Sequence, residues 1–225
     1  GSGQSVVGSA EGYLNTLKGW DFLNDENSLG ASIWEAWWTN LYDLSWDEFE
    51  QSEVALHWPD SYQTVWLLKH HPEHEFFDRL DSAEKEDAAA VVQLAFEQAV
   101  KALDAHVKEG KSLEWASYKA TYVGHLLQAL PAFSRVDLPV GGNGNIVNAM
   151  KKNHGPSWRM IVELGSETKA LGAYPGGQSG NPGSKHYDDI LDTWAAGEYY
   201  PLLYLKSVDD QPSMMSFSST LNPKS

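Results

Sequence analysis

A stripe of small and aliphatic residues between positions 88 and 107 constrains the fold more than any other feature. Side chains spaced by three or four positions lie on one face of an α-helix, and this spacing relates Ala88, Val91, Ala95, Ala99, Leu103 and Val107. The residues DSAE at 81–84 form a capping-box pattern, and Gly110 suits the position after a helix end. The pattern therefore predicts one amphipathic helix about 40 Å long at ~1.5 Å per residue.

The N-terminal segment predicts further helices that could cover this stripe. Apolar residues recur at helical spacing from residue 9 to about residue 46, with a break near 24–27, and a shorter helix is expected at 61–69, before Pro72. Trp34, Trp37 and Trp38 fall on one apolar face. We expect these tryptophans to pack against another segment rather than to form a platform for a carbohydrate or aromatic ligand.

After Trp115 the sequence changes from helical to short extended segments. Asn143-Gly144 predicts a tight turn between short strands. Residues 158–164 alternate between two faces, which predicts a strand, and 170–174 can return antiparallel after a turn. A helix is expected from Ser184 to Gly197 and a last strand at 202–205. The predicted class is α+β, a helix-rich N-terminal half followed by short antiparallel strands and a C-terminal helix.

Three segments follow from this pattern. Residues 4–205 are expected to form one α+β domain, because no linker divides them. Residues 1–3 have the composition of an expression scar, and residues 206–225 lack periodicity and are expected to form a loosely ordered tail.

Charge and composition exclude several classes of partner. The 225 residues hold 16 Lys and Arg against 31 Asp and Glu, a net charge of -15, which would repel nucleic acid and anionic lipid headgroups. No apolar run is long enough to cross a bilayer. With no cysteine, disulfides, thiolate metal sites and cysteine nucleophiles are excluded. The lack of cysteine fits an exported and a cytoplasmic protein equally well. No nucleic-acid or membrane partner is expected.

The sequence GAYPGGQSGNPGSKHYDDI, residues 172–190, concentrates residue types found in hydrolytic sites. Ser179, His186 and Asp188 are the residue types of a catalytic triad, but a triad is defined by geometry. A nucleophile elbow reads G-x-S-x-G, and here Asn181 takes the place of its second glycine. We favour a structural motif, in which Gly177 permits a tight turn, Gln178 and Ser179 fix loop backbone, and His186 and Tyr187 anchor the next helix.

Other candidate sites also favour structural interpretations. His70, His71 and His74 are close in sequence, but Pro72 interrupts the helix that would align them, so no metal site is expected. The glycines at 141–144 match neither phosphate-binding pattern. No cofactor is expected.

Several stretches, taken in order, resemble the C-terminal part of the large subunit of the penicillin acylase family, amide hydrolases with an N-terminal nucleophile. The most specific is GQSGNPGS at 177–184, followed by His186, Tyr187 and Asp188. Upstream, PVGG at 139–142 and HGPSWR at 154–159, which ends in Arg159, fit the same family, with weaker agreement at His125. Ala116, Lys185 and Ile190 depart from frequent family residues.

The resemblance implies a four-layer αββα fold and hydrolysis of a linear amide bond by a serine at the start of the large subunit, with its own α-amine as base. Neither that serine nor its oxyanion partners has a counterpart here, so no catalytic residue is assigned. The implied partner is the missing N-terminal part of the parent acylase, and the implied location is periplasmic or secreted. We expect this chain alone to be inactive.

Three hypotheses therefore remain. The chain is the scaffold portion of an amidase that acts on penicillins, acyl-homoserine lactones or related amides; it is a stand-alone binding or assembly module using exposed aromatic residues; or it is a hydrolase using Ser179 and His186. A scaffold portion cut from a layered core should leave apolar surface uncovered, or covered by a second copy in a homodimer.

Overall fold

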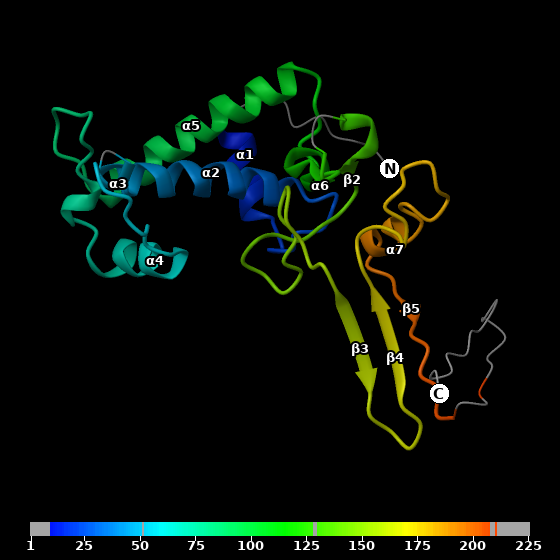
Figure 1. Ribbon diagram of the computed structural model, residues 1–225. Helices are drawn as coiled ribbons and strands as arrows, with labels where there is room; N and C mark the ends of the chain where they lie inside the picture. Colours follow the sequence, from blue (N-terminus) through cyan, green and yellow to red (C-terminus); the bar gives the residue numbers. More distant parts are fainter. Residues whose placement is uncertain (1–9, 51, 128–129, 208–209, 211–225) are drawn as a thin grey trace. The chain divides into compact units, whose positions relative to one another are not determined.

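The computed structural model describes residues 10–50, 52–127, 130–207 and 210, and it divides into two compact units that meet in the sequence between Gly155 and Pro156 (Figure 1). The prediction of one domain over 4–205 stays a prediction. Residues 1–3 and nearly all of the predicted tail lie outside the described residues.

Two long helices form the core of the N-terminal unit. Helix α2 (Leu29–Ser45) lies alongside α5 (Ala88–Lys108) (Figure 1). The predicted stripe on α5 is confirmed from Ala88 to Leu103, since Val91, Ala95, Ala99 and Leu103 are all fully buried, but it does not extend to Val107, which is exposed. The two alanines have only a methyl group, so the backbones of the two helices can approach closely.

Shorter helices complete this unit around two apolar clusters. They are α1 (Ala10–Lys18), α3 (Asp47–Glu50), α4 (Ser61–His70) and the 3-10 helix η1 (Glu75–Phe77). One cluster gathers Trp46, Leu67 and Phe77 with one end of α5, and the other gathers Tyr13 and Ile33 with its other end. Trp37 packs against both clusters, and its indole N–H donates to the Val92 carbonyl at 3.1 Å.

The predicted start of α5 is wrong by several residues. The helix begins at Ala88, where Asp87 accepts from the backbone N–H of Ala90 at 3.0 Å. Ser82 instead closes a local turn with Glu84. The helix therefore has 21 residues, a length of about 31 Å at ~1.5 Å per residue. A capping box is present at α4, between Asp60 and Gln63.

The rest of the N-terminal unit is mostly loop. Helix α6 (Trp115–Lys119) leads into β1 (Thr121–Val123), and β2 (Arg135–Leu138) follows the short η2 (Pro131–Phe133) and pairs antiparallel with β1. The chain does turn at Gly144 and Asn145, as predicted, but the predicted flanking strands are wrong, because Asn143 forms only an isolated bridge to Ala149. Gly142 has φ +83 and a Cβ there would lie 2.3 Å from the Asn148 carbonyl oxygen, so this loop requires glycine.

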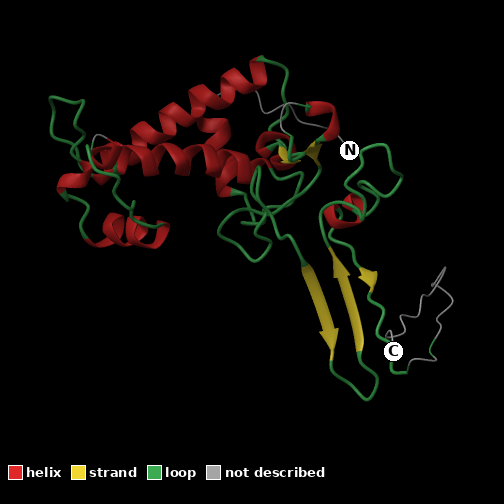
Figure 2. Ribbon diagram, viewed as in Figure 1, coloured by secondary structure: helices red, strands yellow, loops and turns green. Residues whose placement is uncertain are grey.

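The C-terminal unit contains a small antiparallel sheet of order β3-β4-β5 (Figure 2). The predicted strand pair is confirmed as β3 (Arg159–Glu163) and β4 (Lys169–Ala173). Helix α7 (Leu191–Ala195) starts later than predicted, and β5 is Tyr200–Pro201 rather than 202–205. The mixture of helices and small antiparallel sheets agrees with the predicted α+β class (Figure 2). No described helix is both long and apolar enough to span a bilayer.

Candidate functional site

The loop at 176–190 is closed on itself by backbone contacts. The Ser179 N–H donates to the His186 carbonyl at 2.9 Å, and the Ile190 N–H donates to the Gly176 carbonyl at 3.0 Å. A Cβ on Gly177 would lie 2.2 Å from the carbonyl oxygen of His186. Only glycine allows the two limbs of the loop to approach so closely.

The polar side chains of this loop serve local contacts. The Ser179 hydroxyl accepts from the Asn181 N–H at 3.1 Å. The His186 ring contacts Asp189 at 2.7 Å, and its side chain is 55% exposed. Gln178 is exposed, and Tyr187 and Asp188 are half-buried. The geometry gives Ser179 and His186 separate partners, whereas a nucleophile and its base would share a hydrogen bond.

Arg159 joins strand β3 to helix α7. Its guanidinium donates to the Trp194 carbonyl at 2.7 Å and lies 5.0 Å from the centre of the Trp194 indole. The indole N–H donates in turn to the Pro156 carbonyl at 3.0 Å, and Trp194 is buried. Burial lowers the pKa of Arg159, with the Tyr199 charge acting in the opposite direction. These contacts fix the sheet to the helix after the loop.

The histidines singled out in the sequence also have local contacts. His125 accepts from the Leu127 N–H at 3.0 Å, and its ring packs against Phe133. His70 and His71 both pack against the Trp66 ring, whereas His74 accepts from the Phe76 N–H at 3.3 Å. Within the described ranges, no group of three His, Asp or Glu side chains is arranged to hold a metal ion.

A buried lysine in the N-terminal unit was not predicted. Lys119 is only 7% exposed, and its ammonium donates to the carbonyls of Gly141, Gly142 and Met150 at 2.7, 3.0 and 3.1 Å. The Trp115 N–H donates to the same Gly142 carbonyl at 2.7 Å. Burial lowers the pKa of Lys119 to about 8, and the Glu35 carboxylate acts in the opposite direction. The ammonium therefore organises the loop as a bound cation would.

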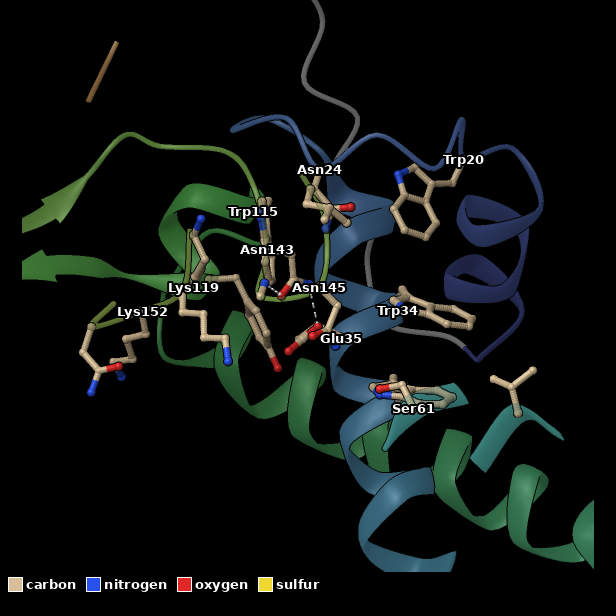
Figure 3. Close-up of a pocket in the computed structure, with 17 residues that line it drawn as sticks. Trp20, Asn24, Trp34, Glu35, Ser61, Trp115, Lys119, Asn143, Asn145 and Lys152 are labelled. Carbon is tan, nitrogen blue, oxygen red and sulfur yellow. Dashed lines mark hydrogen bonds between the residues drawn. The ribbon is translucent and has the colours of Figure 1, made fainter. Parts of the chain in front are cut away.

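A cavity of about 670 Å³ opens beside this lysine, with an aromatic wall and a polar wall (Figure 3). Figure 3 shows Trp20 and Trp34 on one side of Glu35, and Lys119 and Lys152 on the other. The Trp34 ring stacks on Trp38, with centroids 5.9 Å apart and planes 11° apart. An aromatic wall beside polar groups suits a flat ligand with hydrogen-bonding groups.

Glu35 is the acidic group of this cavity. Its carboxylate accepts from the Asn143 side-chain amide at 2.9 Å (Figure 3). Burial raises the pKa of the neighbouring Tyr118, and the Glu35 charge adds to that rise. Neither Glu35 nor Lys119 was singled out from the sequence, because both look like ordinary surface charges on helices.

The sequence profile of the penicillin amidase family, described as "Penicillin amidase", matches residues 3–208. The chain belongs to this family. The predicted resemblance is thereby confirmed, and the match covers the Arg159 contacts, the loop at 176–190 and the Lys119 cavity.

Three relatives carry a more specific name, acyl-homoserine lactone acylase QuiP. The protein from Pseudomonas aeruginosa is 28% identical over 149 residues, which cover 55% of this chain and 18% of the relative. Those from Pseudomonas fluorescens strain Pf-5 and Pseudomonas syringae pv. syringae are 30% and 27% identical, over 16% and 17% of their lengths. The chain therefore matches less than a fifth of each of these acylases.

Proposed function

We propose that this penicillin amidase family chain is the C-terminal scaffold portion of an amidase that hydrolyses a linear amide and releases an acyl group. The nucleophilic serine, its α-amine base and the oxyanion donors would lie in the part of the acylase outside this chain. The names of the relatives make an acyl-homoserine lactone the first substrate class to test, with penicillins as the second. The four-layer αββα fold is part of the same proposal.

One observation carries the assignment of a scaffold role. The loop most specific to the family uses its Ser179 hydroxyl and its His186 ring in separate local contacts. A catalytic serine needs a base within hydrogen-bond reach and donors aimed at the developing oxyanion. The Ser179 hydroxyl accepts from a backbone amide of its own loop, an arrangement that supports a role in shaping the loop.

The test is hydrolysis of an acyl-homoserine lactone and of a phenylacetyl amide by three samples: this chain, the full-length acylase, and the chain mixed with the rest of that acylase. We expect turnover by the full-length protein and by the mixture, and none by the chain alone. Turnover by the chain alone that is lost in Ser179→Ala would overturn the proposal.

The cavity in the N-terminal unit favours a second candidate function, that of a binding module. Trp34 is 37% exposed although its ring stacks on Trp38, and exposed stacked indoles can take a flat ring. The cavity offers Asn145 and Lys152 as nearby polar contacts. A flat, hydroxylated or amide-bearing ligand fits both walls.

This second function is tested by quenching of tryptophan fluorescence with small aromatic amides and sugars. We expect Trp34→Ala to abolish quenching, and Trp158→Ala, which replaces an exposed tryptophan of the other unit, to leave it unchanged. Equal loss in both variants would show non-specific adsorption and exclude the cavity as the site.

A homodimer formed through exposed apolar surface is a further alternative, and sedimentation of the chain measures it.

A further inference from the structure

Strand β3 has a free edge within the described part of the chain. The sheet order places β4 on one side of β3, and β5 pairs on the far side of β4. The central residues of β3 are exposed although they are apolar: Met160 is 56%, Ile161 51% and Val162 40% exposed. An apolar edge strand without cover is a site at which another strand pairs.

The hydrogen bonds of β4 determine which backbone groups of β3 face the free edge. The Leu202 N–H donates to the Ala170 carbonyl at 2.8 Å, so the backbone groups of Ala170 point toward the β5 side. Successive residues of a strand point to opposite sides, so Leu171 points toward β3 and bonds its partner Ile161. Met160 and Val162 therefore direct their N–H and C=O groups outward.

In the described part of the chain, both faces of the sheet also expose apolar side chains, although Gly172 and Ala173 of β4 are buried. Alternation places Met160 and Val162 on one face, together with Trp158 and Leu164, which are 47% and 88% exposed. Ile161 and its partner Leu171 lie on the other face, and both are exposed. Exposed apolar side chains gathered on a surface mark a place where another part of a protein packs, so this sheet has the surface expected where a further layer or further strands would cover it.

We propose that the free edge of β3 accepts an extended strand from the part of the acylase that lies outside this chain. The inference rests on the proposed function, because it takes that larger acylase as given. The relatives supply the occupant, since the chain matches only 16–18% of their lengths. The incoming strand bonds the outward groups of Met160 and Val162 and places apolar side chains beside them.

A second copy of this chain fits the edge less well. Antiparallel pairing of two β3 strands about Ile161 would place Arg159 of one copy opposite Glu163 of the other. The Arg159 guanidinium is already bonded to the Trp194 carbonyl and packed on its indole. Self-pairing would leave the Glu163 carboxylate without that cation, so the edge favours a different strand.

Residue-resolved hydrogen exchange tests the proposal on two samples, the isolated chain and the full-length acylase. In the isolated chain we expect the amides of Met160 and Val162 to exchange fast and that of Ile161 to exchange slowly. In the full-length acylase the first two should slow by roughly 100-fold or more. Fast exchange of Met160 and Val162 in the full-length protein, with Ile161 still slow, would overturn the proposal.

A pair of variants separates backbone pairing from side-chain contact. Val162→Pro removes an outward N–H, a change that edge strands tolerate, while Val162→Ala keeps the N–H and removes most of the side chain. In the full-length acylase we expect Val162→Pro to restore fast exchange at Met160, and Val162→Ala to leave it slow. Slow exchange at Met160 in both variants would contradict strand addition.

Further readouts on the same samples separate this inference from the proposed function. If the full-length acylase hydrolyses acyl amides while Met160 stays unprotected, strand addition is wrong and the proposed function stands. If Met160 is protected without turnover, strand addition stands and the proposed function fails. If the Met160 amide is already protected in the isolated chain, the proposal is overturned. Protection that rises with the concentration of the chain would assign the edge to a second copy, and protection that does not change with concentration would assign it to the N-terminal unit.

Discussion

Helix α5 and strand β3 bury their apolar residues to very different extents. On α5, Val91, Ala95, Ala99 and Leu103 are fully buried against α2 and its neighbours. On β3, Met160, Ile161 and Val162 are all exposed, although they are at least as apolar as the alanines of the helix. The N-terminal unit therefore contains its own core, whereas the sheet of the C-terminal unit presents surface that another layer would cover.

This difference shows where the stability of the chain resides. Burial of apolar surface stabilises the folded state by roughly 25 cal/mol per Å², and α5 gains that free energy within its own unit. The β3 side chains gain little of it in this chain. The C-terminal unit buries a small core that includes Leu191 and Trp194. Directed polar contacts, such as that between Arg159 and Trp194, and the closed loop at 176–190 add to its stability.

Matched truncations of leucine give the largest expected effect. Leu103→Ala removes a side chain that is fully buried, and we expect a loss of about 2–5 kcal/mol from the free energy of unfolding of the N-terminal unit. Leu164→Ala removes a side chain that is 88% exposed, so its effect should stay within about 0.5 kcal/mol. Urea unfolding followed by circular dichroism measures both variants.

The same pair sharpens the comparison in the full-length acylase. If another layer covers the sheet there, Leu164→Ala should cost more than it does in this chain, while the cost of Leu103→Ala stays the same. Equal losses for the two variants in the isolated chain would show that the sheet is already covered, and the contrast between the two units would fail.

A pair of glycine substitutions tests whether the loop holds the C-terminal unit together. A Cβ on Gly177 would meet the His186 carbonyl oxygen at 2.2 Å, whereas a Cβ on Gly180 meets nothing within 4 Å. We expect Gly177→Ala to cost about 1–3 kcal/mol, since backbone must shift, and Gly180→Ala to be neutral within about 0.5 kcal/mol. Exchange of the Ile190 amide, which bonds Gly176, reports loop opening.

Alkaline pH should affect the N-terminal unit through Tyr13. Burial, together with the 2.8 Å hydrogen bond to Asp104, raises the pKa of Tyr13 to about 12 from 10.0. Because the folded state holds this proton more tightly, the contribution is fully present below pH 10 and is lost as pH rises toward 12. We expect a loss of about 1–2 kcal/mol over that range.

The control for this titration is Tyr13→Phe, which removes the ionising group and keeps the ring. Its free energy of unfolding should lack the part of the alkaline decline that Tyr13 contributes, so the difference between wild type and variant should shrink from pH 9 to pH 12. A difference that stays constant with pH would mean that Tyr13 ionises alike in the folded and unfolded states.

The sequence predicted the elements in which one periodicity extends over the whole element. The stripe of α5 and the alternation of β3 have direct physical causes, since side-chain burial follows the helical or the extended repeat. The start of α5 was missed because Asp81 and Asp87 both precede helix-forming residues, and tertiary contacts select between them. The N–H of Ala88 donates to the Pro72 carbonyl at 2.8 Å, a contact that helical spacing does not reveal.

The candidate sites also divide into one that the sequence predicted and others that it missed. The loop at 176–190 was found because its residue types are unusual, and Gly177 was singled out as the position of a tight turn. The Lys119 centre was missed because its partners are three backbone carbonyls, and every residue type presents the same carbonyl group. Glu35 was missed because its partner Asn143 lies 108 positions away.

Replacement of Ser179 has the smallest expected effect on stability and the greatest bearing on function. Ser179→Ala keeps the backbone bond to the His186 carbonyl and loses only the hydroxyl contact with the Asn181 N–H. One hydrogen bond of this kind contributes about 0.5–1.5 kcal/mol. Asn181 is exposed and its N–H can bond water instead, so we expect a loss at the low end of this range.

In the full-length acylase, kcat/KM of Ser179→Ala for an acyl-homoserine lactone should stay within about twofold of wild type, because a structural serine adds nothing specific to the transition state. Gly177→Ala serves as the contrasting variant, since it should lower stability by displacing the loop. If Ser179→Ala abolished turnover while the unfolding curve stayed unchanged, the loop would be the reaction centre, and the division between a self-contained helical unit and a supporting sheet unit would have to be abandoned.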